Sequence, residues 1–541
     1  GKKGPLTSEE IEKAIAEEEK KKETLQVDKF QIGLLSELES IANVRESDDE
    51  WKKILNKISS FKKLRNQRIP KEVNGELRGY QKEGVNWLCF LNEFGFGGIL
   101  ADDMGLGKTL QTLTFLAILK KKRSKLPNLV IAPTSVVTNW MAEVRKFVPH
   151  FKAVLLHGQK RKEHYEEAKK ADLIITTYGL LQRDLDWLSS LELHVVILDE
   201  AQNIKNARSK TAQAVMQLNG KRRLTLTGTP IENSVMELWS QFNFLMPGFF
   251  GSLKEFERDY VKPQSRSKFK KKQPNHNLLR RQTRPFILRR LKQDVAKELP
   301  PKTEQTLMCE MNEQQKRLYN SILEIVRQQV KEKISAGGVK GARIAIFDAL
   351  LKLRQICCDP RLSSLAGNDP PPSAKFSLFI ETLTDIIKEG HRVLVFSQFV
   401  KMLNLMHAEL NQHQIPFLQL DGSTKNRESL VNKFQQNDEY PVFLISLKAG
   451  GTGINLTAAD YVIHYDPWWN PAVEAQATDR AHRIGQKNHL FVYKLITRNS
   501  IEEKIIELQN KKRALADSVV GASDPLEQML NIEDLNDLFA L

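Results

Sequence analysis

The stretch Ala101-Asp102-Asp103-Met104-Gly105-Leu106-Gly107-Lys108-Thr109 follows a predicted strand and opens a helical segment. Its two glycines allow backbone N–H groups to approach phosphate oxygens, and the lysine can reach the β and γ phosphates of a nucleotide. The hydroxyl of Thr109 can ligate Mg²⁺. The usual phosphate-loop pattern begins with a glycine, and Asp102 stands in its place. Because a Gly-Lys-Thr turn also occurs by chance, other parts of the sequence must support a nucleotide site.

A second motif supports it at the end of another apolar strand. Val195-Val196-Ile197-Leu198 runs directly into Asp199-Glu200-Ala201-Gln202. In a parallel sheet such a strand delivers its carboxylates to the edge where nucleotides bind. Asp199 is the candidate Mg²⁺ ligand, and Glu200 is the candidate to polarise the attacking water. A solvated acidic turn is the alternative, but the combination with the phosphate loop favours nucleotide hydrolysis. Specificity for adenine does not follow from these two motifs.

Short β-branched and apolar runs alternate with helical stretches in two separate series, which is typical of parallel sheets with helices on both faces. The sequence therefore predicts an α/β fold with two lobes, at residues 75–234 and 373–499. The predicted strands of the first lobe are 97–101, 129–132, 172–176, 195–198 and 223–227. Those of the second lobe are 393–396, 417–420, 442–446, 461–465 and 490–496.

The remaining segments have helical patterns. Residues 1–74, rich in Lys and Glu, predict an N-terminal helical extension. Residues between the two lobes are also mainly helical in pattern, and residues 500–541 begin with a capping box at Ser500 and Glu503. We expect these helices to flank the two lobes.

Composition narrows the class of partner. The 541 residues are 41% hydrophobic and 27% charged, which fits a folded protein of several domains. Lys and Arg exceed Asp and Glu by 82 to 66, a net charge of +16. Such a surplus favours a polyanionic partner, with nucleic acid ahead of a membrane surface, although solubility alone is the simpler explanation.

Cysteine usage and hydropathy predict where the protein works. Four cysteines without zinc-ligand spacing predict reduced, packed thiols of an intracellular protein. No apolar run approaches the about 20 residues of a membrane span, so we expect a soluble cytoplasmic protein with no membrane partner. Gly1, rather than Met, stands first, as in an excised fragment.

A basic pair stands in the second lobe. Gln476 to Gln486 contains Arg480 and Arg483, three residues apart, which would share one face of a helix. Such arginines can reach the charge that develops on a γ-phosphate bound by the other lobe. Taken alone, a solvated helix surface is the more common role for a basic pair.

The order of these motifs resembles that of superfamily 2 helicase-like ATPases, and more narrowly the Swi/Snf-type DNA translocases of chromatin remodellers. The resemblance covers about residues 75–515. The motifs that carry it are Tyr80-Gln81, 102–109, 199–202, Leu226 to Asn233, Ser446 to Asn455 and 476–486.

The resemblance implies two RecA-like lobes with ATP between them and duplex DNA lying across both. It implies helical protrusions at 235–290 and 311–372, joined by a linker at 291–310. Gln81 matches the residue that reads adenine, and residues 102–109 match the ATP-binding loop. Lys108, Glu200, Arg480 and Arg483 match catalytic residues, and Thr109 and Asp199 match the Mg²⁺ ligands. Residues matching the element that couples hydrolysis to DNA are Gln202, Thr227, Gly228 and Thr229.

Further segments match the DNA-contacting elements of this family. Hydroxyls, glycine N–H groups and a lysine can hold phosphates without reading bases. For Trp469, a role in the core or at the interface between the lobes is the alternative. The predicted DNA-binding residues are Thr134, Trp140, Thr177, Ser423, Lys448, Gly450, Gly451, Thr452 and Trp469.

One departure from the family pattern concerns the branch. The acidic motif reads Asp-Glu-Ala-Gln at 199–202, whereas Asp-Glu-Gly-His is common in eukaryotic remodellers. The glutamine indicates the bacterial and archaeal branch, and hence a location with the nucleoid.

The leading hypothesis is a DNA-dependent ATPase that tracks along duplex DNA as a monomer and displaces or remodels bound proteins. A strand-separating DNA or RNA helicase is the alternative. A non-enzymatic DNA-binding scaffold fits less well, because a relic site would have lost at least one of Lys108, Asp199, Glu200, Arg480 and Arg483.

Overall fold

The computed structural model describes residues 66–122, 126–228, 235–261, 276–450 and 454–507. Seven parallel strands form the sheet of the first lobe, in the order β3-β4-β2-β5-β6-β1-β7. The predicted parallel sheet is thus confirmed, and β3 and β7 are additional strands. The strands are β1 (Gly98–Leu100), β2 (Asn128–Ala132), β3 (Ala153–Leu155), β4 (Leu173–Thr177), β5 (Leu193–Asp199), β6 (Gly220–Leu226) and β7 (Ile287–Leu288).

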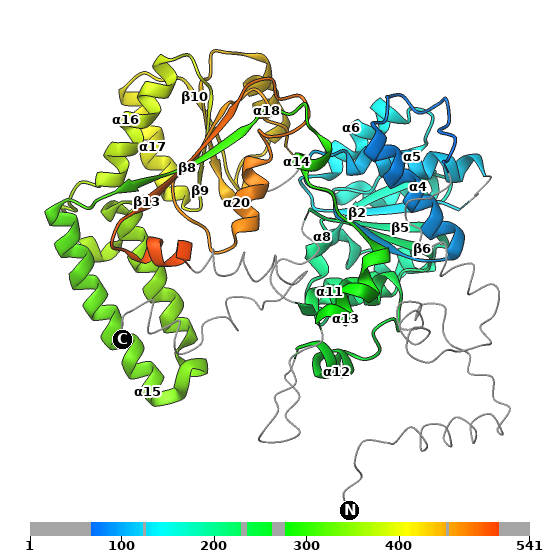
Figure 1. Ribbon diagram of the computed structural model, residues 1–541, viewed down its shortest axis with the longest axis horizontal. Coiled ribbons are helices and arrows are strands. Elements are labelled where there is room, and N and C mark those ends of the chain that lie inside the picture. The colour runs from blue at the N-terminus through cyan, green and yellow to red at the C-terminus, as the bar shows by residue number, and fades with distance from the viewer. Residues whose placement is uncertain (1–65, 123–125, 229–234, 262–275, 451–453, 508–541) are drawn as a thin grey trace, which may run out of the picture. The chain divides into compact units, whose positions relative to one another are not determined.

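Helices connect these strands and flank the sheet, as a parallel arrangement requires (Figure 1). Their ends follow local sequence. Gly95, in the left-handed conformation, caps the end of α4 (Gly79–Phe94), and Ser209 caps the start of α10 (Lys210–Met216), where its side chain accepts a hydrogen bond from Ala212 N. The helices are α4 (Gly79–Phe94), α5 (Lys108–Lys121), α6 (Val137–Phe147), α7 (Tyr165–Lys169), α8 (Tyr178–Leu181), α9 (Leu185–Ser190) and α10 (Lys210–Met216).

The segment between the lobes contributes one strand to each sheet. Just before the predicted linker (291–310), β7 pairs with β1 of the first lobe. At its end, β8 (Lys302–Cys309) pairs with β13 of the second lobe along all eight residues. The linker is therefore anchored at both ends by backbone hydrogen bonds. The helices of this part of the chain are α11 (Val235–Leu245), α12 (Leu253–Phe256), α13 (His276–Thr283) and α14 (Lys292–Val295).

A long helix, α15 (Glu313–Cys358), follows β8 and confirms the helical pattern of this region. Its two halves pack on each other, because Tyr319 and Val326 share one buried cluster with Ile346 and Leu353. Figure 1 shows the two arms side by side.

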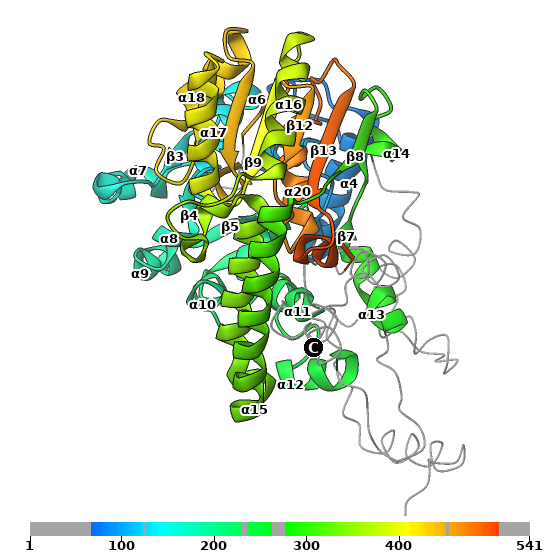
Figure 2. The same ribbon diagram turned by 90° about the vertical axis from the view of Figure 1, so that its left-hand side faces the viewer.

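The second lobe has a six-stranded parallel sheet in the order β10-β11-β9-β12-β13-β8. Figure 2 shows β9, β12, β13 and β8 side by side. The strands are β9 (Val393–Ser397), β10 (Phe417–Leu420), β11 (Val442–Ser446), β12 (Tyr461–His464) and β13 (Leu490–Thr497). The helices are α16 (Ala374–Lys388), α17 (Val400–Gln412), α18 (Arg427–Gln436), α19 (Leu447–Gly450) and α20 (Pro471–Thr478).

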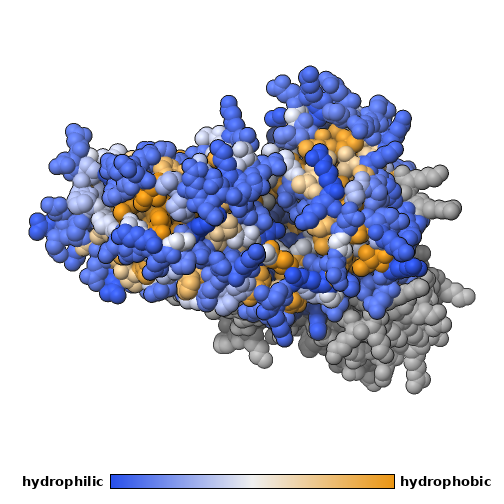
Figure 3. Space-filling model, turned by 90° about the horizontal axis from the view of Figure 1, so that it is seen from above, coloured by the Kyte–Doolittle hydropathy of each residue, from blue (hydrophilic) through white to orange (hydrophobic). Residues whose placement is uncertain are grey.

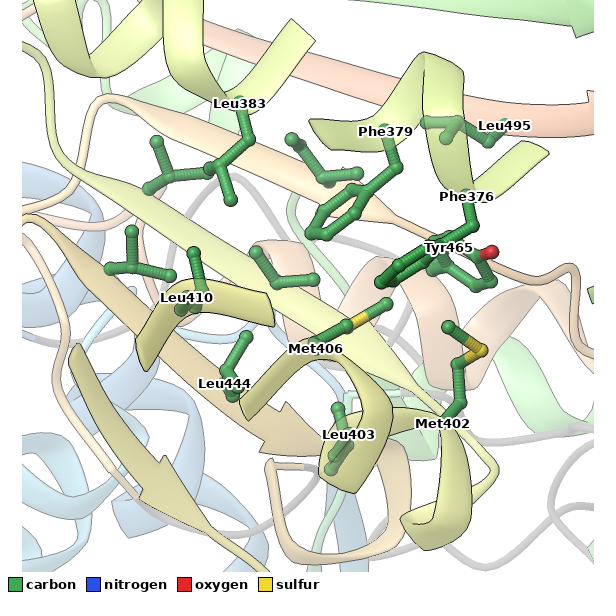
Figure 4. Close-up of a cluster of buried hydrophobic side chains, with 14 of the residues drawn as sticks. Phe376, Phe379, Leu383, Met402, Leu403, Met406, Leu410, Leu444, Tyr465 and Leu495 are labelled. Atoms are coloured by element: carbon green, nitrogen blue, oxygen red, sulfur yellow. The ribbon is translucent and has the colours of Figure 1, made fainter. Parts of the chain in front are cut away.

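Both faces of this second sheet are buried. On one face Val393 and Val395 join a cluster with side chains of α16 and α17, among them Phe379 and Met406 (Figure 4). On the other face, alternate residues of the same strand, including Phe396, join a different cluster. Strand side chains alternate between faces, so a run that is apolar at every position is buried on both sides.

The surface and the cysteines agree with the composition. The face seen in Figure 3 is mainly hydrophilic, with apolar residues in separate patches. Within the residues that the structure describes, no helix is long and apolar enough to cross a membrane. The four cysteines, all of them described, are free and buried, which confirms the prediction of packed thiols.

Candidate nucleotide and DNA site

The phosphate loop lies between β1 and α5. Gly105 and Gly107 have φ angles of 88° and 80°, in the left-handed region that favours glycine. Gly107 immediately precedes the first residue of α5, so the free N–H groups of the helix end are available to an anion. A side chain at Gly107 would meet Gln81 Nε2 at 2.5 Å. The loop therefore has the backbone shape that phosphate binding requires.

Gln81 lies against this loop. Its Nε2 donates to Leu106 O at 3.1 Å, and its Oε1 accepts from Arg78 N at 3.0 Å. The hydroxyl of Tyr80 also donates to Leu106 O, at 3.1 Å. The structure thus brings Gln81 to the loop, and its role in reading adenine stays a prediction.

Lys108 and the acidic motif meet at one edge of the sheet. Leu100 and Asp199 both align with Leu226 of the intervening strand β6, so β1 and β5 end at the same level. Lys108 Nζ donates to Asp102 O at 2.6 Å, and its charge acts on Asp199. The two motifs predicted to bind nucleotide therefore form one site.

Asp199 is held from several sides. Its Oδ2 accepts from Trp140 Nε1 at 2.7 Å, its Oδ1 from Glu200 N at 2.9 Å, and its main-chain O from Tyr178 Oη at 2.8 Å. Burial raises the pKa of Asp199, and repulsion from Glu200 raises it further, while Trp140 and Lys108 oppose the shift. Because a nearby cation favours the ionised carboxylate, this environment suits a bound divalent metal.

Mg²⁺ was predicted to lie between Thr109 and Asp199. Among the described residues, no three His, Cys, Asp or Glu side chains gather as a metal cluster. Mg²⁺ in phosphoryl-transfer sites takes only one or two protein ligands and fills its shell with waters and phosphate oxygens. The buried Asp199 carboxylate and the Thr109 hydroxyl, which hydrogen-bonds Glu143, are oxygen ligands of the right kind. They fit the ion.

Trp140 and Thr177 occupy positions that contradict the prediction of direct DNA contacts. Trp140 is 0% exposed, and its indole N–H is bonded to the carboxylate of Asp199 inside the lobe. Thr177 is 2% exposed, and its Oγ1 accepts from Leu180 N at 3.2 Å to cap α8. The motif match places these residues correctly along the chain, but burial assigns their side chains to the support of lobe 1.

A hydrogen-bonded series leads from the acidic motif to the predicted coupling motif. Gln202 Nε2 donates to Glu200 Oε2 at 2.8 Å, and Thr227 Oγ1 donates to Gln202 Oε1 at 3.1 Å. Glu200 itself has a φ of 51°, which is uncommon for a residue with a side chain and typical of functional sites. Gly228 follows at the end of β6, and Thr229 lies outside the described residues.

The two arginines of the second lobe do not share a helix, and that prediction is wrong. α20 ends at Thr478, and the chain continues in turns, with Arg480 N bonded to Ala477 O at 3.2 Å and Ala481 N to Thr478 O at 3.0 Å. Because the two arginines lie in turns and not on one helix, the local backbone sets the direction of each side chain separately.

Arg480 and Arg483 nevertheless lie close to the motifs of lobe 1. Burial lowers the pKa of Arg480 to about 10, and the charges of Glu200 and Asp199 oppose this shift. Arg480 therefore stays protonated at neutral pH. A Cβ placed on Gly105 would lie 2.7 Å from Arg483 Cβ, so this residue contacts the phosphate loop. The structure thus brings all four predicted catalytic residues together.

His464 contacts the end of α20, just before the turn that contains Arg480, and its burial predicts how the stability of the protein depends on pH. Its Nε2 lies 2.8 Å from Thr478 Oγ1, and burial lowers its pKa to about 4. Because the unfolded histidine protonates near pH 6.5, stability should be full above that pH and fall as the pH drops toward 4. We expect a loss of about 2 kcal/mol at pH 5, from about 1.4 kcal/mol per pH unit.

Urea unfolding at pH 7 and pH 5 measures this loss. His464→Gln should lose about 2 kcal/mol less than the unaltered chain between the two pH values. The exposed His407→Gln is the matched control and should behave like the unaltered chain. Equal losses in all three proteins would contradict a neutral, buried His464.

Three of the predicted DNA-binding residues are exposed and follow strand ends. Thr134 follows β2, Ser423 follows β10 and Lys448 follows β11. In the turn after β10, Asp421 Oδ1 accepts from Ser423 N at 2.8 Å and fixes the loop. Ser423 Oγ donates to the same oxygen at 2.6 Å. The exposed side chains of Thr134 and Lys448 are available to a ligand. Gly450 ends α19, and Gly451 and Thr452 lie outside the described residues.

Trp469 is half-buried where α15 meets lobe 2. Its ring packs on the buried cluster of α15, and the guanidinium of Arg354 lies 5.5 Å from the ring centre. Arg354 also pairs with Asp466 at 3.7 Å. This packing agrees with the core role that the sequence left open, and a DNA contact by the exposed part of the ring stays a prediction.

Sequence reasoning missed three residues beside the phosphate loop. Lys292 joins the lobes, since its N donates to Asp103 Oδ2 at 3.0 Å and its Nζ to Asp479 Oδ1 at 2.6 Å. Burial raises the pKa of Glu143, which hydrogen-bonds Thr109. Arg290 binds Asp102. No motif marks these residues, because their partners are distant in sequence.

Comparisons with known proteins agree with this geometry. Residues 80–362 match the SNF2-related domain, and residues 375–485 match the helicase conserved C-terminal domain. The Bacillus subtilis putative ATP-dependent helicase/translocase YwqA is 40% identical over 91% of this chain and 54% of its own length. Human TATA-binding protein-associated factor 172 is 36% identical over 90% of this chain and 30% of its own length. The chain thus spans about half, or less, of these relatives.

Among solved structures, the Sulfolobus solfataricus SWI2/SNF2 ATPase core in complex with dsDNA is 36% identical. The match covers 88% of this chain and 99% of that chain, with a TM-score of 0.43.

Proposed function

The chain belongs to the family of the SNF2-related domain, and on this premise we propose that it is an ATP-dependent double-stranded DNA translocase. It would hydrolyse ATP at the site formed by Lys108, Asp199 and Glu200 and use lobe closure and reopening to track along duplex DNA. The observation that carries this proposal is the hydrogen-bonded series Glu200–Gln202–Thr227. It offers a physical path between the residue at the attacking water and the predicted coupling motif.

The residues divide the chemistry of hydrolysis among them. Glu200 would orient the attacking water and accept its proton. Lys108 and the N–H groups at the start of α5 would hold the phosphates, and the two arginines of lobe 2 would neutralise charge that develops during transfer. Thr109 and Asp199 would hold Mg²⁺, which would supply positive charge against the phosphates during transfer.

Exposed polar side chains support duplex DNA as the track. Thr134, Ser423 and Lys448 can contact phosphates, and phosphate contacts carry no sequence information. The net charge of +16 favours such a polyanion. A motor that moves along arbitrary sequence needs this kind of contact.

The names of the relatives point to a protein substrate bound on DNA. One is a helicase/translocase and another is associated with the TATA-binding protein. We infer that the product of this motor is the displacement or remodelling of DNA-bound protein. It would act as a monomer in the cytoplasm, with the nucleoid if the source is prokaryotic.

The nucleic acid that stimulates ATP hydrolysis tests the proposal. At low salt, duplex DNA should raise ATP turnover by at least about tenfold, as expected if DNA must help assemble the catalytic arrangement. Single-stranded DNA and RNA should have smaller effects. Turnover that ignores duplex DNA would contradict the proposal, and selective stimulation by RNA would favour an RNA helicase.

A further inference from the structure

Asp102 occupies the place of the first phosphate-loop glycine, and its side chain is fully buried. Arg290 binds it with two parallel bonds, from Nε to Oδ1 at 2.8 Å and from Nη2 to Oδ2 at 2.5 Å. Gln111 Nε2 adds a third bond to Oδ2 at 3.1 Å. A bidentate arginine–carboxylate pair fixes both partners in geometry as well as in energy.

Two further N–H donors of Arg290 are also used. Nη2 donates to Gln111 Oε1 at 2.8 Å, and Nη1 donates to Tyr80 O. The guanidinium lies 5.2 Å from the centre of the Tyr80 ring. α4 leaves space for this cluster only because residue 84 is glycine: a Cβ there would lie 1.9 Å from Gln111 Oε1 and 2.8 Å from Arg290 Nη2. Arg290 therefore joins the phosphate loop, α5 and α4.

The main chain around Arg290 is bound to the same loop. Arg290 O accepts from Asp103 N at 3.0 Å, and Leu288 O accepts from Ala101 N at 2.7 Å. On the loop side, the main-chain oxygen of Asp102 accepts from Lys108 Nζ. One loop residue thus meets Arg290 through its carboxylate and the phosphate-binding lysine through its carbonyl.

We propose that Arg290 is a positioning residue that holds the phosphate loop and Lys108 in their nucleotide-binding arrangement through Asp102. This inference rests on the proposed function and deepens it, because it makes nucleotide affinity depend on the segment between the lobes. Two residues further on, Lys292 bonds to Asp479 of lobe 2. A change in this segment would therefore reach the phosphate loop directly.

The test compares two adjacent arginines. Arg290→Gln should weaken binding of a fluorescent ATP analogue by about tenfold, as expected if only a tenth of the molecules keep the competent loop. The KM for ATP should rise by a similar factor, with kcat nearly unchanged at saturation. Arg289→Gln, at an exposed neighbour, should match the unaltered chain. Equal affinity in the two variants would overturn the proposal.

A second variant separates positioning from loss of folding. Arg290→Gln leaves a buried carboxylate without its cation, so the double variant with Asp102→Asn removes both charges. We expect the double variant to bind the analogue about tenfold more weakly than the unaltered chain, as Arg290→Gln alone does, because it too lacks the pair that positions the loop. Its stability should be nearly normal, since replacing both members of a buried pair is often near neutral for folding. Thermal unfolding verifies that it folds. If a folded double variant binds the analogue as tightly as the unaltered chain, the pair does not position the loop and the proposed action through Asp102 is wrong.

The binding assay also separates this inference from the proposed function. If the unaltered chain does not bind the ATP analogue, the proposed function fails, and the role of Arg290 fails with it. If the unaltered chain binds and both arginine variants bind equally well, only the positioning role of Arg290 fails.

Discussion

Arg480→Ala is expected to lower DNA-stimulated ATP turnover by at least about 10³-fold, the lower end of the range for an arginine that stabilises phosphoryl-transfer charge. Arg480 is 2% exposed, and the carboxylates of Glu200 and Asp199 act on its charge. Lobe 2 therefore supplies a cation at the edge of lobe 1 where hydrolysis would occur. Steady-state phosphate release with saturating duplex DNA and ATP measures the loss.

An exposed arginine of the same lobe is the control for this prediction. Arg498 forms a surface ion pair with Glu310 at 3.0 Å, and Arg498→Ala should leave turnover within about twofold, because such pairs contribute little. Duplex binding by Arg480→Ala should be nearly normal. Turnover within tenfold of the unaltered chain would show that Arg480 has no catalytic role.

Glu200→Gln is expected to reduce turnover by about 10² to 10⁴-fold, the range for loss of a general base. The substitution keeps the size of the side chain and an acceptor for Gln202 Nε2, which lies 2.8 Å from Glu200 Oε2. The variant should therefore fold and still bind ATP and duplex DNA. Single-turnover hydrolysis with bound ATP isolates the chemical step.

Glu192→Gln is the matched control, since this exposed residue immediately precedes the same strand, β5. It should leave turnover unchanged. Lys108→Ala should also abolish turnover but through loss of phosphate binding, so it should raise the concentration of ATP needed for saturation. If Glu200→Gln hydrolyses bound ATP at the normal rate, a different group must activate the water.

The apolar runs of the sequence predicted ten of the strands, most of them largely buried. Val393–Ser397 is apolar over four positions because alternate side chains enter two different clusters. Strand β8 escaped prediction, because Lys302–Cys309 is mostly polar and exposed at the edge of its sheet. Its pairing with β13 depends on tertiary structure, which local pattern does not encode.

Motif order also predicted most of the residues that gather at the candidate nucleotide site, and contacts between distant residues account for those that it missed. Arg290 bonds to Asp102 across 188 positions of sequence, and a bidentate pair leaves no periodic signal. Trp140 was assigned to DNA, but its indole N–H reaches Asp199 inside the lobe. The turn after Thr478 replaced an expected helix, and the backbone bonds of that turn set the directions of Arg480 and Arg483.

Displacement of a triplex-forming strand from duplex DNA tests the central claim most directly. A motor that tracks on the duplex should remove the third strand in the presence of ATP and Mg²⁺, and Lys108→Ala should remove none. The same preparation should leave a forked duplex unseparated. If the fork is unwound and the triplex stays intact, the protein separates strands and is not a double-stranded DNA translocase.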